Sequence, residues 1–172
     1  MTDPSRIPAG SAFPALEWSQ TDGGMLAPAG TEGWRLLVVY RGAHCPLCRK
    51  YLKTLESLQP AFADAGITVA ALSADPGERA IKEAGEEGWT FPVGYDLTPD
   101  QMRTMGLYVS SPRSPEETDR DFAEPGLFVI NPQGAIQIVD VSNAPFARPD
   151  LEGLLHGLKF VIAKDYPIRG TA

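Results

Sequence analysis

Two cysteines separated by two residues, Cys45 and Cys48, are the side chains of this chain best suited to chemistry. They are its only cysteines, and it has two histidines, His44 and His156. A thiol attacks only as the thiolate. The two-residue spacing lets both sulfur atoms meet across one helical turn, so one cysteine can attack and its neighbour can resolve it to an intramolecular disulfide. The pair therefore indicates redox chemistry.

The elements around the pair favour a reactive thiolate. Residues 34–40 form an apolar run typical of a buried strand, which ends at Arg41. Pro46 begins a helical pattern that reaches Phe62, with an expected kink or stop at Pro60. At a helix N-terminus, unpaired N–H groups and the helix dipole lower a cysteine pKa from about 8.5 to roughly 3.5–7.5. Arg41 and His44 add candidate positive charge nearby.

Two other interpretations of the cysteine pair stay open. A zinc site needs four ligands, and this chain offers only the two cysteines, His44 and the distant His156, which makes an unusual set. The cysteines could instead be inert thiols packed as small hydrophobic side chains. A redox pair is favoured because strand, C-x-x-C motif and helix start coincide. We therefore predict no metal and no cofactor, and no glycine-rich phosphate-binding loop is visible.

The remaining pattern predicts one α/β domain. We expect a central mixed sheet flanked by helices on both faces, formed by residues 34–172, with an N-terminal arm over residues 1–33 that contains one short strand. The expected elements are strands at 14–18, 67–72, 91–95, 127–130 and 135–141, helices at 76–87 and 99–105, a last helix from Pro149, and a surface segment at 107–124. The strands at 127–130 and 135–141 read as an antiparallel hairpin.

Composition excludes several classes of function. The 172 residues, 43% hydrophobic, provide one substantial core. Lys and Arg total 15 against 22 Asp and Glu, for a net charge of −7, so nucleic-acid binding is not expected. The N-terminal residues lack the apolar stretch of a secretory signal, and no apolar run is long enough to span a bilayer. We expect a cytoplasmic protein with reduced thiols and no membrane partner.

Several segments resemble the peroxiredoxin-like branch of the alkyl hydroperoxide reductase and thiol-specific antioxidant family, within the thioredoxin-fold superfamily. Its active-site strand, loop and helix are similar to residues 38–49, VVYRGAHCPLCR. Further similarity covers residues 72–75, 124–134, 145–149 and 165–170, so it extends over about residues 30–170. The resemblance implies a thioredoxin-like fold, a hydroperoxide substrate and an external thiol reductant of thioredoxin or glutathione type, in a protein that could form a homodimer.

The chain departs from the family pattern at three supporting positions. Peroxiredoxins carry Pro-x-x-x-Thr-x-x-Cys, and with Cys48 as the peroxidatic residue Arg41 stands at the Pro position and Cys45 at the Thr position. Pro125 stands where peroxiredoxins place an Arg before a late strand. Pro125 instead resembles the cis-proline of thioredoxins, or is a plain turn proline. Arg41 is either a substitute for the missing Arg or a strand-end charge paired with an acid. His44 either lowers the pKa of the neighbouring thiol or shuttles a proton, or it makes an ordinary hydrogen bond to the loop backbone.

The resemblance implies a thiol peroxidase whose catalytic residues are Cys45 and Cys48, supported by Arg41, His44 and Pro125. If the pair acts as in peroxiredoxins, Cys48 attacks the peroxide and becomes a sulfenic acid, and Cys45 condenses with it to form a disulfide. If the pair acts as in thioredoxins, Cys45 attacks a substrate disulfide, and Cys48 resolves the mixed disulfide that forms. Two alternatives to the peroxidase are therefore a thiol-disulfide oxidoreductase and a non-catalytic redox-sensing interaction module.

Overall fold

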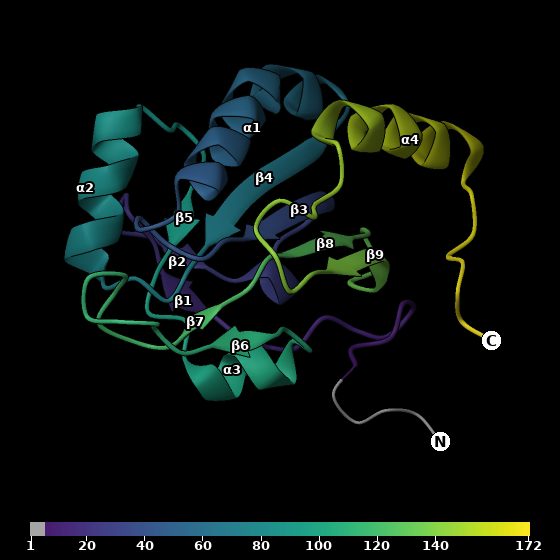
Figure 1. Ribbon diagram of the computed structural model, residues 1–172. Coiled ribbons are helices and arrows are strands. Elements are labelled where there is room, and N and C mark those ends of the chain that lie inside the picture. Colours follow the sequence, from purple (N-terminus) through teal and green to yellow (C-terminus); the bar gives the residue numbers. More distant parts are fainter. Residues whose placement is uncertain (1–5) are drawn as a thin grey trace.

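A mixed sheet organises the computed structural model, which describes residues 6–172 (Figure 1). In this part of the chain the main sheet has five strands in the order β5-β4-β3-β8-β9. Three strands run parallel, namely β3 (Trp34–Val39), β4 (Ile67–Leu72) and β5 (Val93–Gly94). The first hairpin strand, β8 (Gly126–Ile130), runs antiparallel to β3, and the second, β9 (Ile136–Val141), runs antiparallel to β8. The predicted hairpin and the predicted mixed sheet are both confirmed.

Helices cover both faces of this sheet, as predicted (Figure 1). On one face lie α1 (Pro46–Asp64), α2 (Gly77–Glu87) and α4 (Leu151–Lys164), and on the other lies the short α3 (Pro99–Thr104). Alternate residues of β3 point to opposite faces, which divides the buried side chains into two clusters. Within residues 6–172 no helix is both long and apolar enough to cross a membrane.

Helix α1 begins at Pro46 as predicted, but it does not stop at Pro60. It continues to Asp64 because its apolar face extends as far as Phe62, which is fully buried. That packing stabilises the last turn although Pro60 donates no backbone hydrogen bond. The helix therefore does not stop at Pro60, and the kink that was the other expectation there stays a prediction.

The N-terminal arm packs against the face that carries α3. Its first five residues lie outside the described part of the chain. The strand expected at 14–18 is displaced: β1 is Trp18–Ser19, and it pairs with β2 (Met25–Leu26). Phe13 and Trp18 are buried in the cluster of apolar side chains on the α3 face of the sheet. The Trp18 indole donates a hydrogen bond to the Gln101 side chain at 2.8 Å. The division into an arm and a domain stays a prediction.

Two expected segments are shorter or less exposed than predicted. The strand expected at 91–95 is reduced to the two residues of β5, because only these pair with β4. The surface segment 107–124 is fixed by a small ladder between β6 (Val109–Ser110) and β7 (Phe122–Ala123). Phe122 is buried, so this segment ends inside the molecule, next to the cysteines' loop.

Candidate active site

The two cysteines lie together where the loop after β3 enters α1. The backbone N–H of Cys45 donates to the Gly42 carbonyl at 3.1 Å, which closes a tight turn before the helix. Cys45 is the N-cap of α1, and its Sγ atom accepts the backbone N–H of Cys48 at 3.2 Å. Both cysteines are free thiols, and they are 2% and 0% exposed. The predicted pair is therefore assembled at the predicted junction.

Asp75 fixes the loop that presents the cysteines. Its carboxylate, 2% exposed after β4, accepts the Ala43 backbone N–H at 2.7 Å and pairs with Arg79 at 3.2 Å. Gly42 has a φ of +139°, and a Cβ there would lie 2.8 Å from the Asp75 carboxylate. The close approach of loop to carboxylate therefore requires glycine at this position.

The environment makes Cys45 the more acidic thiol. A hydrogen bond from Cys48, together with the Cys48 backbone N–H and the Arg41 guanidinium, lowers the pKa of Cys45 to about 6. The pKa of Cys48 is raised, because Cys48 is the donor to Cys45 and because it is buried. The pair thus shares one negative charge, held on Cys45 at neutral pH, with a protonated Cys48 beside it.

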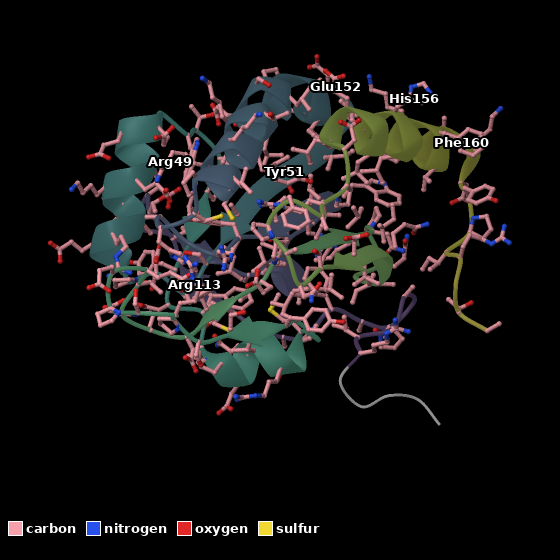
Figure 2. The ribbon with its side chains drawn as sticks, viewed as in Figure 1. Arg49, Tyr51, Arg113, Glu152, His156 and Phe160 are labelled. Atoms are coloured by element: carbon pink, nitrogen blue, oxygen red, sulfur yellow. The ribbon has the colours of Figure 1, made fainter. Side chains whose placement is uncertain are left out.

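Arg148 contacts Cys48, although no role was predicted for it. Its Nη2 atom donates to the Cys48 Sγ at 3.3 Å and to the Pro145 carbonyl at 2.6 Å. The guanidinium lies 4.5 Å from the centroid of the Tyr51 ring, and the Tyr51 hydroxyl donates to the Pro149 carbonyl at 2.6 Å. Figure 2 shows Tyr51 extending from α1 toward the loop before α4. Tyr51 therefore positions the guanidinium that faces the Cys48 sulfur.

Sequence reasoning missed Arg148 because it is 100 residues from Cys48 along the chain. The available signal was its place in residues 145–149, a segment that resembles the family between the hairpin and the last helix. The antiparallel hairpin returns the chain to the edge of the sheet near α1, and so places this loop beside the cysteines (Figure 1).

Arg41 is paired with acids, as one interpretation expected, and it also lies near Cys45, while its role as a substitute for the missing Arg stays a prediction. It lies close enough to Cys45 to lower the pKa of that thiol. It also pairs with Glu124 at 3.1 Å and Glu117 at 3.6 Å, and its guanidinium lies 4.8 Å from the centroid of the Phe122 ring. Arg41 thus ties the segment 107–124 to the cysteine loop.

His44 packs edge-on against the Phe122 ring, with 4.7 Å between the ring centroids. Neither of its ring nitrogens has a hydrogen-bond partner, and burial lowers the pKa of His44. Burial thus disfavours the positive charge considered for His44, and its role in tuning the thiol stays a prediction. His156 is exposed on α4, as Figure 2 shows, remote from the cysteines. In residues 6–172 no three His, Cys, Asp or Glu side chains come together in a group that could hold a metal ion.

Pro125 is buried just before β8, and it lines a small recess together with Tyr51, Arg148 and Pro149. Its carbonyl accepts the Ser142 backbone N–H at 3.0 Å. No peptide bond among the described residues is cis, so the likeness to the thioredoxin cis-proline was wrong in this respect. Pro125 cannot supply a guanidinium, whereas Arg148 brings one to the same recess.

The sequence pattern of the AhpC/TSA family matches residues 9–139, which include most of the N-terminal arm, the cysteine loop and most of the sheet. The chain belongs to the AhpC/TSA family. This confirms the resemblance stated from the sequence, and with it the class of enzyme, a peroxiredoxin-like thiol peroxidase.

One relative of this AhpC/TSA protein is the Mycobacterium tuberculosis protein named "Putative peroxiredoxin Rv2521". The two are 28% identical over 109 residues, which cover 63% of this chain and 69% of the relative.

Solved structures share the fold at low sequence identity. A cysteine mutant of peroxiredoxin 6 from Arenicola marina has a TM-score of 0.79 at 19% identity, over 96% of this chain and 80% of that one. Peroxidoxin BcpB from Mycobacterium tuberculosis has a TM-score of 0.72 at 16% identity, over 94% of this chain and 99% of that one. These matches confirm the predicted thioredoxin-like architecture.

Proposed function

We propose that the protein reduces hydroperoxides through the Cys45–Cys48 pair, with Cys45 as the attacking thiolate and Cys48 as the resolving thiol. The observation that carries this assignment is the position of the Cys45 sulfur at the N-cap of α1, where it accepts the Cys48 N–H. The thiolate is the nucleophilic form of cysteine, and Cys45 is the thiol whose pKa is lowered.

The reaction proceeds in two steps on the protein. The Cys45 thiolate attacks one oxygen of the peroxide, the O–O bond breaks, and the leaving alkoxide or hydroxide takes a proton, so that Cys45 becomes a sulfenic acid. The Cys48 sulfur then attacks the Cys45 sulfur, the S–O bond breaks, and water leaves. Two external thiol groups, from one dithiol or from two thiol molecules, then reduce the resulting disulfide and are themselves oxidised to a disulfide. Arg41 and Arg148 stabilise negative charge on the two sulfur atoms.

Burial of the pair favours a peroxide over a protein disulfide as the substrate. The two cysteines are 2% and 0% exposed, and a protein disulfide has to bring its own sulfur into line with the attacking one. A hydroperoxide presents only two small oxygen atoms. The thiol-disulfide oxidoreductase is therefore the less well supported alternative.

The partners and location stay predictions. The thiol reductant, of thioredoxin or glutathione type, the homodimer and the cytoplasmic location were expected from the sequence.

The test compares two oxidants on the reduced protein. With stoichiometric hydroperoxide, we expect rapid loss of both thiols in the wild type and no rapid reaction in Cys45→Ser. Reduction of insulin disulfides without peroxide reactivity would instead establish the oxidoreductase. If neither cysteine reacts faster than a free thiol with either oxidant, the redox-sensing and structural interpretations gain and the proposal fails.

A further inference from the structure

Arg148 is a cation without an acidic partner. It takes part in none of the ion pairs among the described residues, and Asp140, which lines the same recess, does not come within 4 Å of its guanidinium. Its Nη1 atom is buried and has no hydrogen-bond partner. Its Nε and Nη2 atoms donate to the Pro145 carbonyl, and Nη2 also donates to the Cys48 sulfur at 3.3 Å. Among these contacts, only the sulfur can carry negative charge.

Tyr51 determines where this guanidinium lies. Its ring centroid is 4.5 Å from the guanidinium carbon, and its hydroxyl donates to the Pro149 carbonyl at 2.6 Å. Pro149 follows Arg148 directly, so one tyrosine contacts both the guanidinium and the backbone that carries it. A cation over an aromatic face is attracted by the ring. Because Cys48 and Tyr51 are three residues apart on α1, the helix presents the sulfur and the ring to the same arginine.

The negative charge that faces Arg148 exists in only one redox state of the cysteines. The reduced pair holds one negative charge at neutral pH, as the lowered pKa of Cys45 indicates. In the disulfide neither sulfur is charged. Hydrogen bonds to a charged group are roughly twice as strong as those between neutral groups. Oxidation therefore weakens the contact between Arg148 and Cys48, and it leaves the guanidinium without a counter-charge.

We propose that Tyr51 is a positioning residue that, through Arg148, stabilises the reduced form of the Cys45–Cys48 pair and so raises its reduction potential. A contact that stabilises the dithiol makes the disulfide easier to reduce, which favours the step that recycles the protein. The inference rests on the proposed function only in that the two cysteines form a disulfide. The order in which the cysteines act and the nature of the oxidant do not enter it.

The test measures an equilibrium with glutathione. Two glutathione molecules reduce the Cys45–Cys48 disulfide: its S–S bond breaks, the two glutathione sulfur atoms join as oxidised glutathione, and their protons pass to Cys48 and to the solvent. The protein is equilibrated at pH 7 with mixtures of reduced and oxidised glutathione, or of dithiothreitol if glutathione does not reduce it. Acid quenching, alkylation and intact-protein mass spectrometry give the reduced fraction. No peroxide is used, so failure of this inference is distinguishable from failure of the peroxidase.

Loss of either side chain is expected to favour the disulfide. Arg148→Gln shifts the equilibrium constant toward the disulfide by about tenfold, which corresponds to a reduction potential about 30 mV more negative. Tyr51→Leu removes the ring and the hydroxyl, and it shifts the constant in the same direction by about threefold. The double variant shifts no further than Arg148→Gln alone, because Tyr51 acts through the guanidinium.

A second arginine–tyrosine pair of this chain provides the matched control. The Arg169 guanidinium lies 5.8 Å from the centroid of the Tyr166 ring and donates to the Tyr166 hydroxyl at 2.9 Å. Both residues belong to the tail after α4, which leaves the end of that helix opposite to the loop that carries Arg148 (Figure 1). Arg169→Gln and Tyr166→Leu are expected to keep the wild-type reduction potential.

Three results of the equilibrium measurement overturn the inference: a wild-type or less negative potential in Arg148→Gln, an equal shift in the control variants, and additive shifts in the double variant, which would show that Tyr51 acts without Arg148. Hydrogen exchange of the wild type tests the inference even if the variants fold poorly. Because coupling is reciprocal, residues 143–148 must exchange faster in the disulfide form than in the dithiol form. Equal exchange of this segment in the two forms also overturns the inference.

Discussion

The Sγ atom of Cys45 accepts the backbone N–H of Cys48 at 3.2 Å, so the same two residues form the cap of helix α1 and the redox pair. The cap places negative charge where the helix has unpaired N–H groups and the positive end of its dipole. The same contact therefore stabilises the start of helix α1 and the negative charge on the Cys45 sulfur.

The first prediction concerns the ionisation of Cys45. Ultraviolet absorbance of the thiolate in the reduced protein is expected to titrate at about pH 6. Cys45→Ser removes this titration. Cys48→Ala shifts it to higher pH, because the largest cause of the lowered pKa is the hydrogen bond from Cys48. A reduced wild type without thiolate below about pH 8 would contradict the assignment of the charge.

The second prediction concerns the loop before the pair. Gly42→Ala introduces a Cβ 2.8 Å from the Asp75 carboxylate on a backbone with φ of +139°, so it is expected to destabilise the fold by about 2 kcal/mol and to slow the reaction of Cys45. Denaturant unfolding measures the first effect and alkylation rates the second. Gly85→Ala in α2 is the control, because a Cβ there meets nothing within 4 Å. An unchanged stability in Gly42→Ala would show that the loop tolerates a side chain.

The third prediction concerns Arg148. Arg148→Ala removes the guanidinium that donates to the Cys48 sulfur, so disulfide formation is expected to slow by about tenfold. Rapid-quench measurement of disulfide content after peroxide addition provides the rate. Arg103→Ala is the control, since Arg103 pairs only with the exposed Asp100 among its described contacts. Equal rates in both variants would remove Arg148 from the mechanism.

The fourth prediction concerns the pH dependence of stability. The pKa of Glu83 is raised in the folded protein from 4.5 to about 7, so the folded state binds more protons than the unfolded state between these values. Its contribution to stability is therefore present at low pH and is lost as the pH rises through about 7. Relative to wild type, Glu83→Gln is expected to lose about 2 kcal/mol less between mildly acidic and mildly alkaline pH. Parallel pH profiles of the unfolding free energy for the two proteins would contradict this.

The sequence predicted what depends on local pattern. Alternation and apolar runs indicated the strands, and Pro46 after Cys45 indicated the helix start. Residues brought in by long-range folding were not predictable in the same way. Arg148 reaches the pair from 100 positions away in sequence, and it has no local signature of its role. The stop expected at Pro60 failed because tertiary packing of Phe62 outweighs a local helix-breaking preference.

The most direct test of the account identifies which sulfur is oxidised first. One equivalent of hydroperoxide is added to reduced Cys45→Ser and Cys48→Ser in the presence of a sulfenic-acid trap, and the adduct is located by mass spectrometry. The account predicts a rapid adduct on Cys45 in Cys48→Ser and none above the rate of a free thiol in Cys45→Ser. A rapid adduct on Cys48 in Cys45→Ser, with none on Cys45 in Cys48→Ser, would contradict it.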